Sequence, residues 1–240
     1  MNTLEASIRR LTQPVNGQFP RPWMTDMVRP ERARIFIVGA NQATPFPAAL
    51  VEGHEAYIDA LFNRNGKSCR KLYEEMRGHE GPSQTRKNID AFRAALANVG
   101  VNDVLETNVI CYSTPMSSDL AHKTHQGGKE AGRAIFLALL DIIRPVALIA
   151  HGAGTNKELA RVLCADLPSP PLHQVDGVTR ARVHAQLRGE AYAPMIFAIP
   201  SLAPPKWNGW QKWAQSHLAE VCSEVRKFLD EDFQRSQPDV

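Results

Sequence analysis

The chain has 240 residues, 43% of them hydrophobic, which is enough to bury the core of one large domain. No run approaches the roughly 20 apolar residues of a membrane-spanning helix, and no apolar signal segment opens the chain, so we expect a cytoplasmic protein without a membrane partner. Four widely spaced cysteines match no zinc or redox motif and predict free thiols, with no metal and no cofactor. The net charge of +3 permits nucleic-acid binding without requiring it.

The sequence divides into three parts. Residues 1–33 predict a helix followed by an extended, proline-containing arm, residues 34–230 a single α/β domain, and residues 231–240 a flexible tail. Apolar runs with little polar alternation predict buried strands within the domain. These runs are residues 34–39, 104–110, 146–150 and 194–199.

Apolar residues at helical spacing follow each of these runs. They predict helices over residues 50–62, 89–99, 131–143 and 155–163, and a last helix from Trp210 onward. Strands that alternate with helices indicate parallel crossover units. We therefore expect a three-layer α/β/α sandwich around a short four-stranded parallel sheet, with ligands bound at the carboxyl ends of the strands. Residues 63–81 and 167–182 show no clear pattern.

Polar residues follow the first predicted strand. Gly39 allows the backbone to turn and to approach a ligand, and Asn41 offers an uncharged donor and acceptor. The segment is neither a P-loop nor a dinucleotide fingerprint. Phe46 lies between two prolines, and it either presents a rigid face on which a base stacks or covers the edge of the sheet.

The second predicted strand carries a Thr-Asn pair inside an apolar run. An amide is costly to bury without hydrogen bonds, so Asn108 either holds a neighbouring loop or binds a ligand. A side-chain amide pairs with two adjacent polar atoms at once, as the edge of a pyrimidine requires. We expect Asn108 to read a base.

The last two predicted strands end in residues suited to phosphate or pocket contacts. His151 precedes a helix whose free N–H groups attract anions, although capping or packing is the commoner role of such a histidine. Ser201 lies at a proline-stiffened turn and is expected to contact a phosphate. The loop around it is expected to face DNA, with an apolar wedge beside the strand, although its Trp could instead pack on the last helix. The residues of this loop are Pro200, Leu202, Lys206 and Trp207.

Taken together, the strand ends resemble the uracil-DNA glycosylase superfamily over residues 34–229. Gly39-Ala40-Asn41 is similar to the Gly-x-Asn motif of its mismatch-specific and single-strand-selective branches, whose Asn positions the attacking water. Thr107-Asn108 is similar to the strand whose Asn binds the uracil edge, and Pro200-Ser201 matches the end of a His-Pro-Ser loop. Each motif is common by itself, so the order and placement of all three carry the resemblance.

The resemblance implies a monomeric DNA glycosylase that hydrolyses the N-glycosidic bond of uracil or another deaminated or mismatched base by base flipping, on single- or double-stranded DNA. Asn41 would be the catalytic residue. The base pocket would comprise Gly39, Gln42, Phe46 and Asn108.

Departures from the family pattern leave two alternatives open. Ile199 replaces the His that stabilises the departing base, Gln42 replaces the usual Pro, and the cysteines of the iron–sulfur branches are incomplete, so we expect no cluster. One alternative is a catalytically inactive nucleic-acid or nucleotide-binding protein on the same fold. The other is an unrelated α/β hydrolase, since residues 151–154 faintly resemble an oxyanion-hole loop, although no Gly-x-Ser-x-Gly elbow is present.

Overall fold

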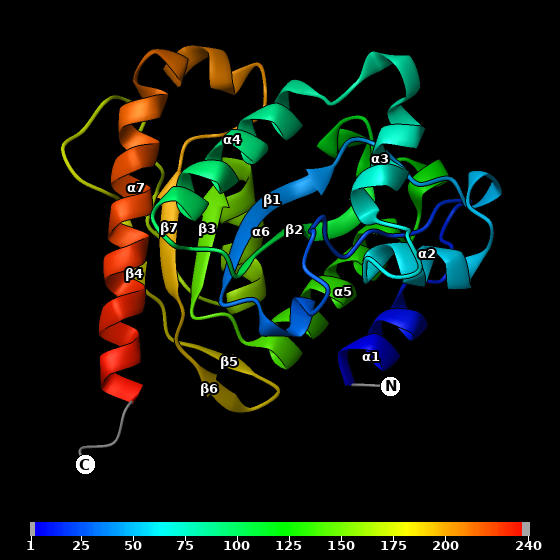
Figure 1. The fold of residues 1–240 in the computed structure, drawn as a ribbon, viewed down its shortest axis with the longest axis horizontal. Helices are drawn as coiled ribbons and strands as arrows, with labels where there is room; N and C mark the ends of the chain where they lie inside the picture. The colour runs from blue at the N-terminus through cyan, green and yellow to red at the C-terminus, as the bar shows by residue number, and fades with distance from the viewer. Residues whose placement is uncertain (1–2, 237–240) are drawn as a thin grey trace.

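A mixed five-stranded β-sheet forms the centre of the protein, whose computed structural model describes residues 3–236 (Figure 1). The strand order is β2–β1–β3–β7–β4, in which β4 runs antiparallel to β7 and the other strands are parallel. The four predicted strands are confirmed, but the prediction of a purely parallel four-stranded sheet is wrong at the β4 edge. The bounds are β1 Ile35–Gln42, β2 Val104–Ser113, β3 Ala147–His151, β4 Arg180–Arg182 and β7 Met195–Ile199.

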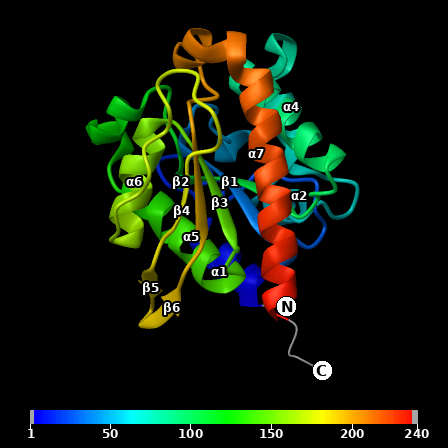
Figure 2. The same cartoon turned by 90° about the vertical axis from the view of Figure 1, so that its left-hand side faces the viewer.

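Helices cover both faces of the sheet, which gives three layers (Figure 2). One face is covered by α5 and α6, with α1 to α3 beside them, and the other by α4 and α7. The helices are α1 Thr3–Leu11, α2 His54–Leu61, α3 Cys69–Arg77, α4 Gln84–Asn98, α5 Gly128–Ile143, α6 Ala153–Leu163 and α7 Lys206–Ser236. Short 3₁₀ helices lie at Pro30–Arg32, Ala48–Leu50, Gly78–Glu80, Ser117–Ala121 and Lys123–His125.

The alternation of side chains along β1 explains why the sheet has a core on each face. Phe36 and Val38 point into the core that includes α5 and α6, whereas Ile35 and Ile37 point into the core under α4 and α7. Successive side chains of a strand point to opposite faces. A strand that is apolar at every position is therefore buried on both sides, as the sequence predicted.

The arm after α1 packs along the outer edge of β2 rather than standing apart. The N–H group of Arg21 donates to the carbonyl of Cys111 (3.0 Å), and that of Met24 donates to the carbonyl of Glu106 (2.9 Å). Trp23 is fully buried, and its Nε1 donates to the carbonyl of Leu61 (2.8 Å). The arm thus belongs to the same core as the α/β domain.

The last helix is longer than the sequence suggested. Because α7 continues to Ser236, residues 231–236 of the expected tail are helical, and residues 237–240 lie outside the described part of the chain. Among the described helices, none combines the length and the apolar character needed to cross a bilayer.

Candidate functional site

A crevice of about 700 Å³ lies at the carboxyl ends of the parallel strands. Its walls come from the ends of β1, β2 and β3, the loop after β7, the start of α4 and the N-terminal arm. This volume falls in the usual range for small-molecule sites. Six of the residues singled out from the sequence line it: Asn41, Gln42, Asn108, His151, Ser201 and Lys206.

Asn108 lies on β2 directly opposite Gly39 of β1. A Cβ atom on Gly39 would lie 2.5 Å from Asn108 Oδ1 and 3.0 Å from His151 Nε2, so the glycine makes room for both side chains. Gly39 is therefore a strand residue that shapes the crevice from beneath, and the turn expected at this point comes only after Gln42. The amide of Asn108 has no hydrogen-bond partner among residues 3–236, which leaves its donor and acceptor for a ligand.

Asn41 lies near the end of β1, and the loop after β2 holds its amide. Asn41 Nδ2 donates to Thr114 Oγ1 (2.9 Å), and Asn41 Oδ1 accepts from Ser117 Oγ (2.7 Å). Thr114 Oγ1 in turn donates to the carbonyl of Met116 (2.8 Å). The orientation of the amide is thus fixed, while Oδ1 keeps a second lone pair.

Gln42 and Phe46, which follow Asn41 in the sequence and were expected to contact a base, have other roles. Phe46 is 1% exposed and lies outside the crevice, because it packs edge-on against Tyr57 in the core and the guanidinium of Arg21 lies over its ring. The prediction that Phe46 presents a stacking face is therefore wrong. Gln42 lines the crevice, but its amide is buried, donates to the carbonyl of Arg21 and accepts from Ser113 Oγ (3.3 Å). It ties the arm to β1.

His151 is a neutral group at the floor of the crevice. Burial, with a smaller contribution from the Arg86 charge, lowers the pKa of His151 to about 4. Its Nδ1 is buried without a hydrogen-bond partner among the described residues. Ser201 lies beside it in the crevice, where its Oγ accepts from the N–H of Ala203 (3.2 Å).

The loop after β7 is mostly packed against the core. Leu202 is fully buried, and its carbonyl accepts from Asn88 Nδ2 (2.8 Å), so the prediction that it wedges beside DNA is wrong. Trp207 is partly buried and packs edge-on against Trp210, which is the packing alternative rather than a DNA-facing role. Pro200 is also partly buried and does not line the crevice. Of this loop, the exposed Lys206 does line it.

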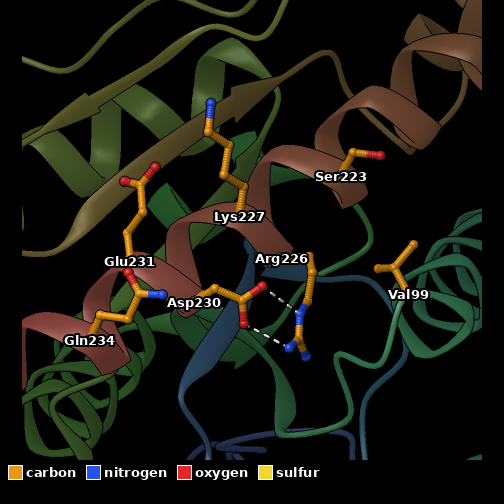
Figure 3. A pocket seen from close by; sticks show the side chains of 7 residues that line it. All are labelled: Val99, Ser223, Arg226, Lys227, Asp230, Glu231 and Gln234. Carbon is orange, nitrogen blue, oxygen red and sulfur yellow. Dashed lines mark hydrogen bonds and ion pairs between the residues drawn. The ribbon is translucent and has the colours of Figure 1, made fainter. Parts of the chain in front are cut away.

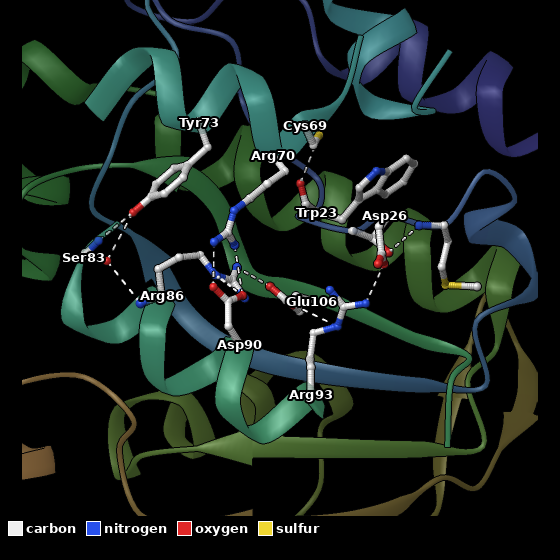
Figure 4. A network of polar contacts seen from close by, with 12 residues as sticks. Trp23, Asp26, Cys69, Arg70, Tyr73, Ser83, Arg86, Asp90, Arg93 and Glu106 are labelled. Carbon is white, nitrogen blue, oxygen red and sulfur yellow. Dashed lines mark hydrogen bonds and ion pairs between the residues drawn. The ribbon is translucent and has the colours of Figure 1, made fainter. Parts of the chain in front are cut away.

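A largely buried network of charges, which the sequence did not predict, forms part of the crevice wall (Figure 4). Glu106 of β2 pairs with Arg86 and with Arg93 (3.2 Å), while Asp90 pairs with Arg86 (2.9 Å) and Arg70 (2.7 Å). Arg86 and Glu106 both line the crevice. The available signal was a carboxylate inside the apolar run 104–110 and the i,i+4 spacing of Arg86 and Asp90.

A second hollow, of about 400 Å³, lies between α7 and the end of α4 (Figure 3). Two of its charged side chains, those of Arg226 and Asp230, form an ion pair (2.6 Å). Such exposed pairs are typical of a solvated helix face. The hollow is lined by Val99, Ser223, Arg226, Lys227, Asp230, Glu231 and Gln234.

The crevice at the strand ends is therefore the stronger candidate. It joins two neutral amides, several hydroxyl groups and a net positive lining, which suits a flat polar ligand that carries a negative group. No model of a known protein family matches the chain, and no curated protein matches it.

Proposed function

We propose that the protein hydrolyses the N-glycosidic bond of uracil, or of another deaminated or mismatched base in DNA, on a uracil-DNA-glycosylase-like fold. One observation carries the proposal. Asn41 and Asn108, which come from paired parallel strands, line a single crevice at the carboxyl ends of those strands. These are the two positions to which the resemblance of the strand ends gives the water-positioning and base-reading roles.

Asn108 supports the base-reading step. Its amide has no partner among residues 3–236, so an entering base meets a donor and an acceptor that need not first give up protein contacts. A base flipped out of the DNA stack would place its polar edge there. Lys206, exposed at the rim, is suited to a backbone phosphate.

Asn41 supports the hydrolytic step by positioning. Thr114 and Ser117 hold its amide, and the second lone pair of Oδ1 is free to orient a water molecule. The water oxygen forms a bond to the sugar carbon as the bond between that carbon and the base nitrogen breaks. The electron pair of the broken bond leaves with the base, and the proton released by the water neutralises the base. A neutral amide does not remove the proton itself, so the rate rests on orientation and electrostatic stabilisation.

A single-turnover assay tests the proposal. Single strands and duplexes that carry uracil, mismatched thymine or other deaminated bases are incubated with the protein, and abasic sites are detected by alkaline strand cleavage. We expect base release by the natural chain and a loss on the order of 100-fold for Asn41→Ala. Gly39→Ala should cost a similar factor, because the new Cβ displaces the Asn108 amide.

Asn102→Ala is the matched control, since Asn102 is exposed just before the amino end of β2 and does not line the crevice. Each variant is checked for a natural circular-dichroism spectrum. If the whole panel stays uncut at high protein concentration, the catalytic proposal is wrong.

A second candidate is a protein that binds a nucleotide or nucleic acid without cleaving it. The observation that favours it is that Thr114 and Ser117 each hydrogen-bond the Asn41 amide, so this side chain already has a structural role in holding the loop after β2. Salt-dependent DNA binding without base release, equally strong in Asn41→Ala, would identify this function.

A further inference from the structure

Arg21 is a buried cation with no carboxylate partner among residues 3–236. It lies on the N-terminal arm, it is 8% exposed, and it lines the crevice. None of its side-chain N–H groups donates to any residue from 3 to 236, and Nη1 is fully buried. A guanidinium has five such donors.

The groups around Arg21 orient its charge but do not neutralise it. The guanidinium carbon lies 4.7 Å from the centre of the Phe46 ring and 5.8 Å from that of Tyr73, within the range of cation–π contact. Cys69 and Tyr57 are also near, but burial raises the pKa of the Cys69 thiol to about 12 and that of Tyr57 well above its ordinary value, so both are neutral. Burial lowers the pKa of Arg21 as well, yet an arginine stays protonated near neutral pH.

The other buried charges of the crevice are already compensated, and Lys206 is exposed to solvent. Arg86 lies between Glu106 and Asp90 and pairs with both, and Arg93 also pairs with Glu106. Glu106 is the one carboxylate among the described residues that line the crevice, and it makes no ion pair with Arg21. The crevice therefore keeps an unbalanced positive charge at Arg21.

We propose that Arg21 forms an anion-binding subsite in the crevice, filled by a negatively charged group of the ligand. A buried charge is costly unless it is paired and hydrogen-bonded, and an anion in the crevice would supply both the opposite charge and the acceptors. Two groups share this chemistry: the ionised ring of a base and a phosphate. The identification with an ionised base rests on the proposed function, in which the base departs with the bonding electron pair.

This subsite would also take the role of the histidine that stabilises the departing base in the uracil-DNA glycosylase superfamily, which the strand ends resemble. Ile199 stands at that position, is fully buried in the core under α7, and does not line the crevice. The cation of the crevice, Arg21, therefore comes from the N-terminal arm and not from the end of β7.

Binding of small anions to the full chain tests the subsite without requiring catalysis. The probes are barbiturate, a pyrimidine whose ring is ionised at neutral pH, inorganic phosphate, and neutral uracil, each titrated by calorimetry. We expect at least one of the two anions to bind the natural chain. The Arg21→Met variant should bind that anion with at least tenfold lower affinity and should bind uracil with unchanged affinity. Arg29→Met, which removes an exposed charge from the same arm, should bind as the natural chain does.

The outcomes separate the possibilities. Barbiturate binding that depends on Arg21 assigns the subsite to an ionised base, and phosphate binding that depends on Arg21 assigns it to a phosphate. If neither anion binds the natural chain, or if Arg21→Met binds them equally well, the proposal is wrong. Should Arg21→Met fail to fold, Arg21→Gln carries the same test. Because these titrations need no base release, a failed glycosylase assay leaves their result standing.

Discussion

At the scale of single residues, burial decides the charge of His151. The sequence placed this histidine after the third strand and left its role open between phosphate contact and packing. In the structure it is 8% exposed, no carboxylate of the described residues contacts it, and burial lowers its pKa to about 4. His151 is therefore neutral near pH 7, and protonation of its ring in the folded state would lower the stability of the protein.

The stability of the protein should fall on acidification because of His151. Its folded pKa of about 4 lies below the ordinary value of 6.5, so below pH 6.5 the unfolded chain binds this proton more readily. The resulting loss reaches about 3 kcal/mol as the pH falls from 6.5 to 4 and then levels off. Urea denaturation of the natural chain and of His151→Gln between pH 7 and pH 4 measures it. Equal pH dependence in the two proteins would contradict the assignment.

At the scale of elements, two glycines allow α5 to pack closely against β2. A Cβ atom on Gly132 would lie 2.8 Å from the backbone N of Cys111, and one on Gly128 would lie 2.5 Å from the ring of Tyr112. Backbone atoms of a hydrogen-bonded strand have little freedom to move, so these two glycines let the helix approach. The sequence predicted this helix from its apolar character but not this reason for its glycines.

Gly132→Ala should therefore push α5 away from β2. We expect a loss of roughly 1–3 kcal/mol in the free energy of unfolding, because the added methyl group meets backbone. Gly209→Ala is the matched control, since Gly209 is exposed in α7 with no atom within 4 Å of its new Cβ, and alanine favours the helix by about 1 kcal/mol. Chemical denaturation of both variants measures the difference. An unchanged or higher stability in Gly132→Ala would contradict the contact.

At the scale of the whole molecule, the N-terminal arm and the α/β domain share one core. The arm supplies Trp23 and Phe19 to the core around α2 and carries Arg21 to the crevice. The boundary at residue 33 suggested by the sequence thus separates segments of the chain rather than separate cores. Because the arm closes one wall of the crevice, its docking is coupled to the site.

Trp23→Ala tests that coupling. The side chain is fully buried, packs edge-on against Phe62 and donates to the Leu61 carbonyl, so its loss should cost roughly 3–5 kcal/mol. Unfolding followed by circular dichroism and by tryptophan fluorescence should give coincident single transitions in the natural chain. Trp23→Phe, which keeps most of the packing, should lose less. A separate early transition for the arm would show that it folds independently.

Most elements were predictable from apolar runs or helical spacing, whereas α3 and the short strand β4 were not predicted. The four parallel strands and α4 to α7 follow from apolar runs and helical spacing that a local window contains. α3 was missed, although Ser68 as N-cap and Cys69, Leu72, Tyr73 and Met76 at helical spacing offered a signal. β4 has three residues and pairs with β7 alone, so its sequence carries no usable period.

By itself the sequence determined the four parallel strands, their order of succession along the chain, and two polar residues on them, Asn41 near the end of its strand and Asn108 within its strand. These are local properties, because the periodicity of apolar side chains and the polar residues that follow an apolar run can be recognised within a short stretch of sequence. Only the tertiary structure decided that Phe46 is covered, that Leu202 is buried, and that Arg21 reaches the crevice. Those outcomes depend on contacts between residues far apart in the chain, such as the guanidinium of Arg21 over the ring of Phe46, which no local pattern records.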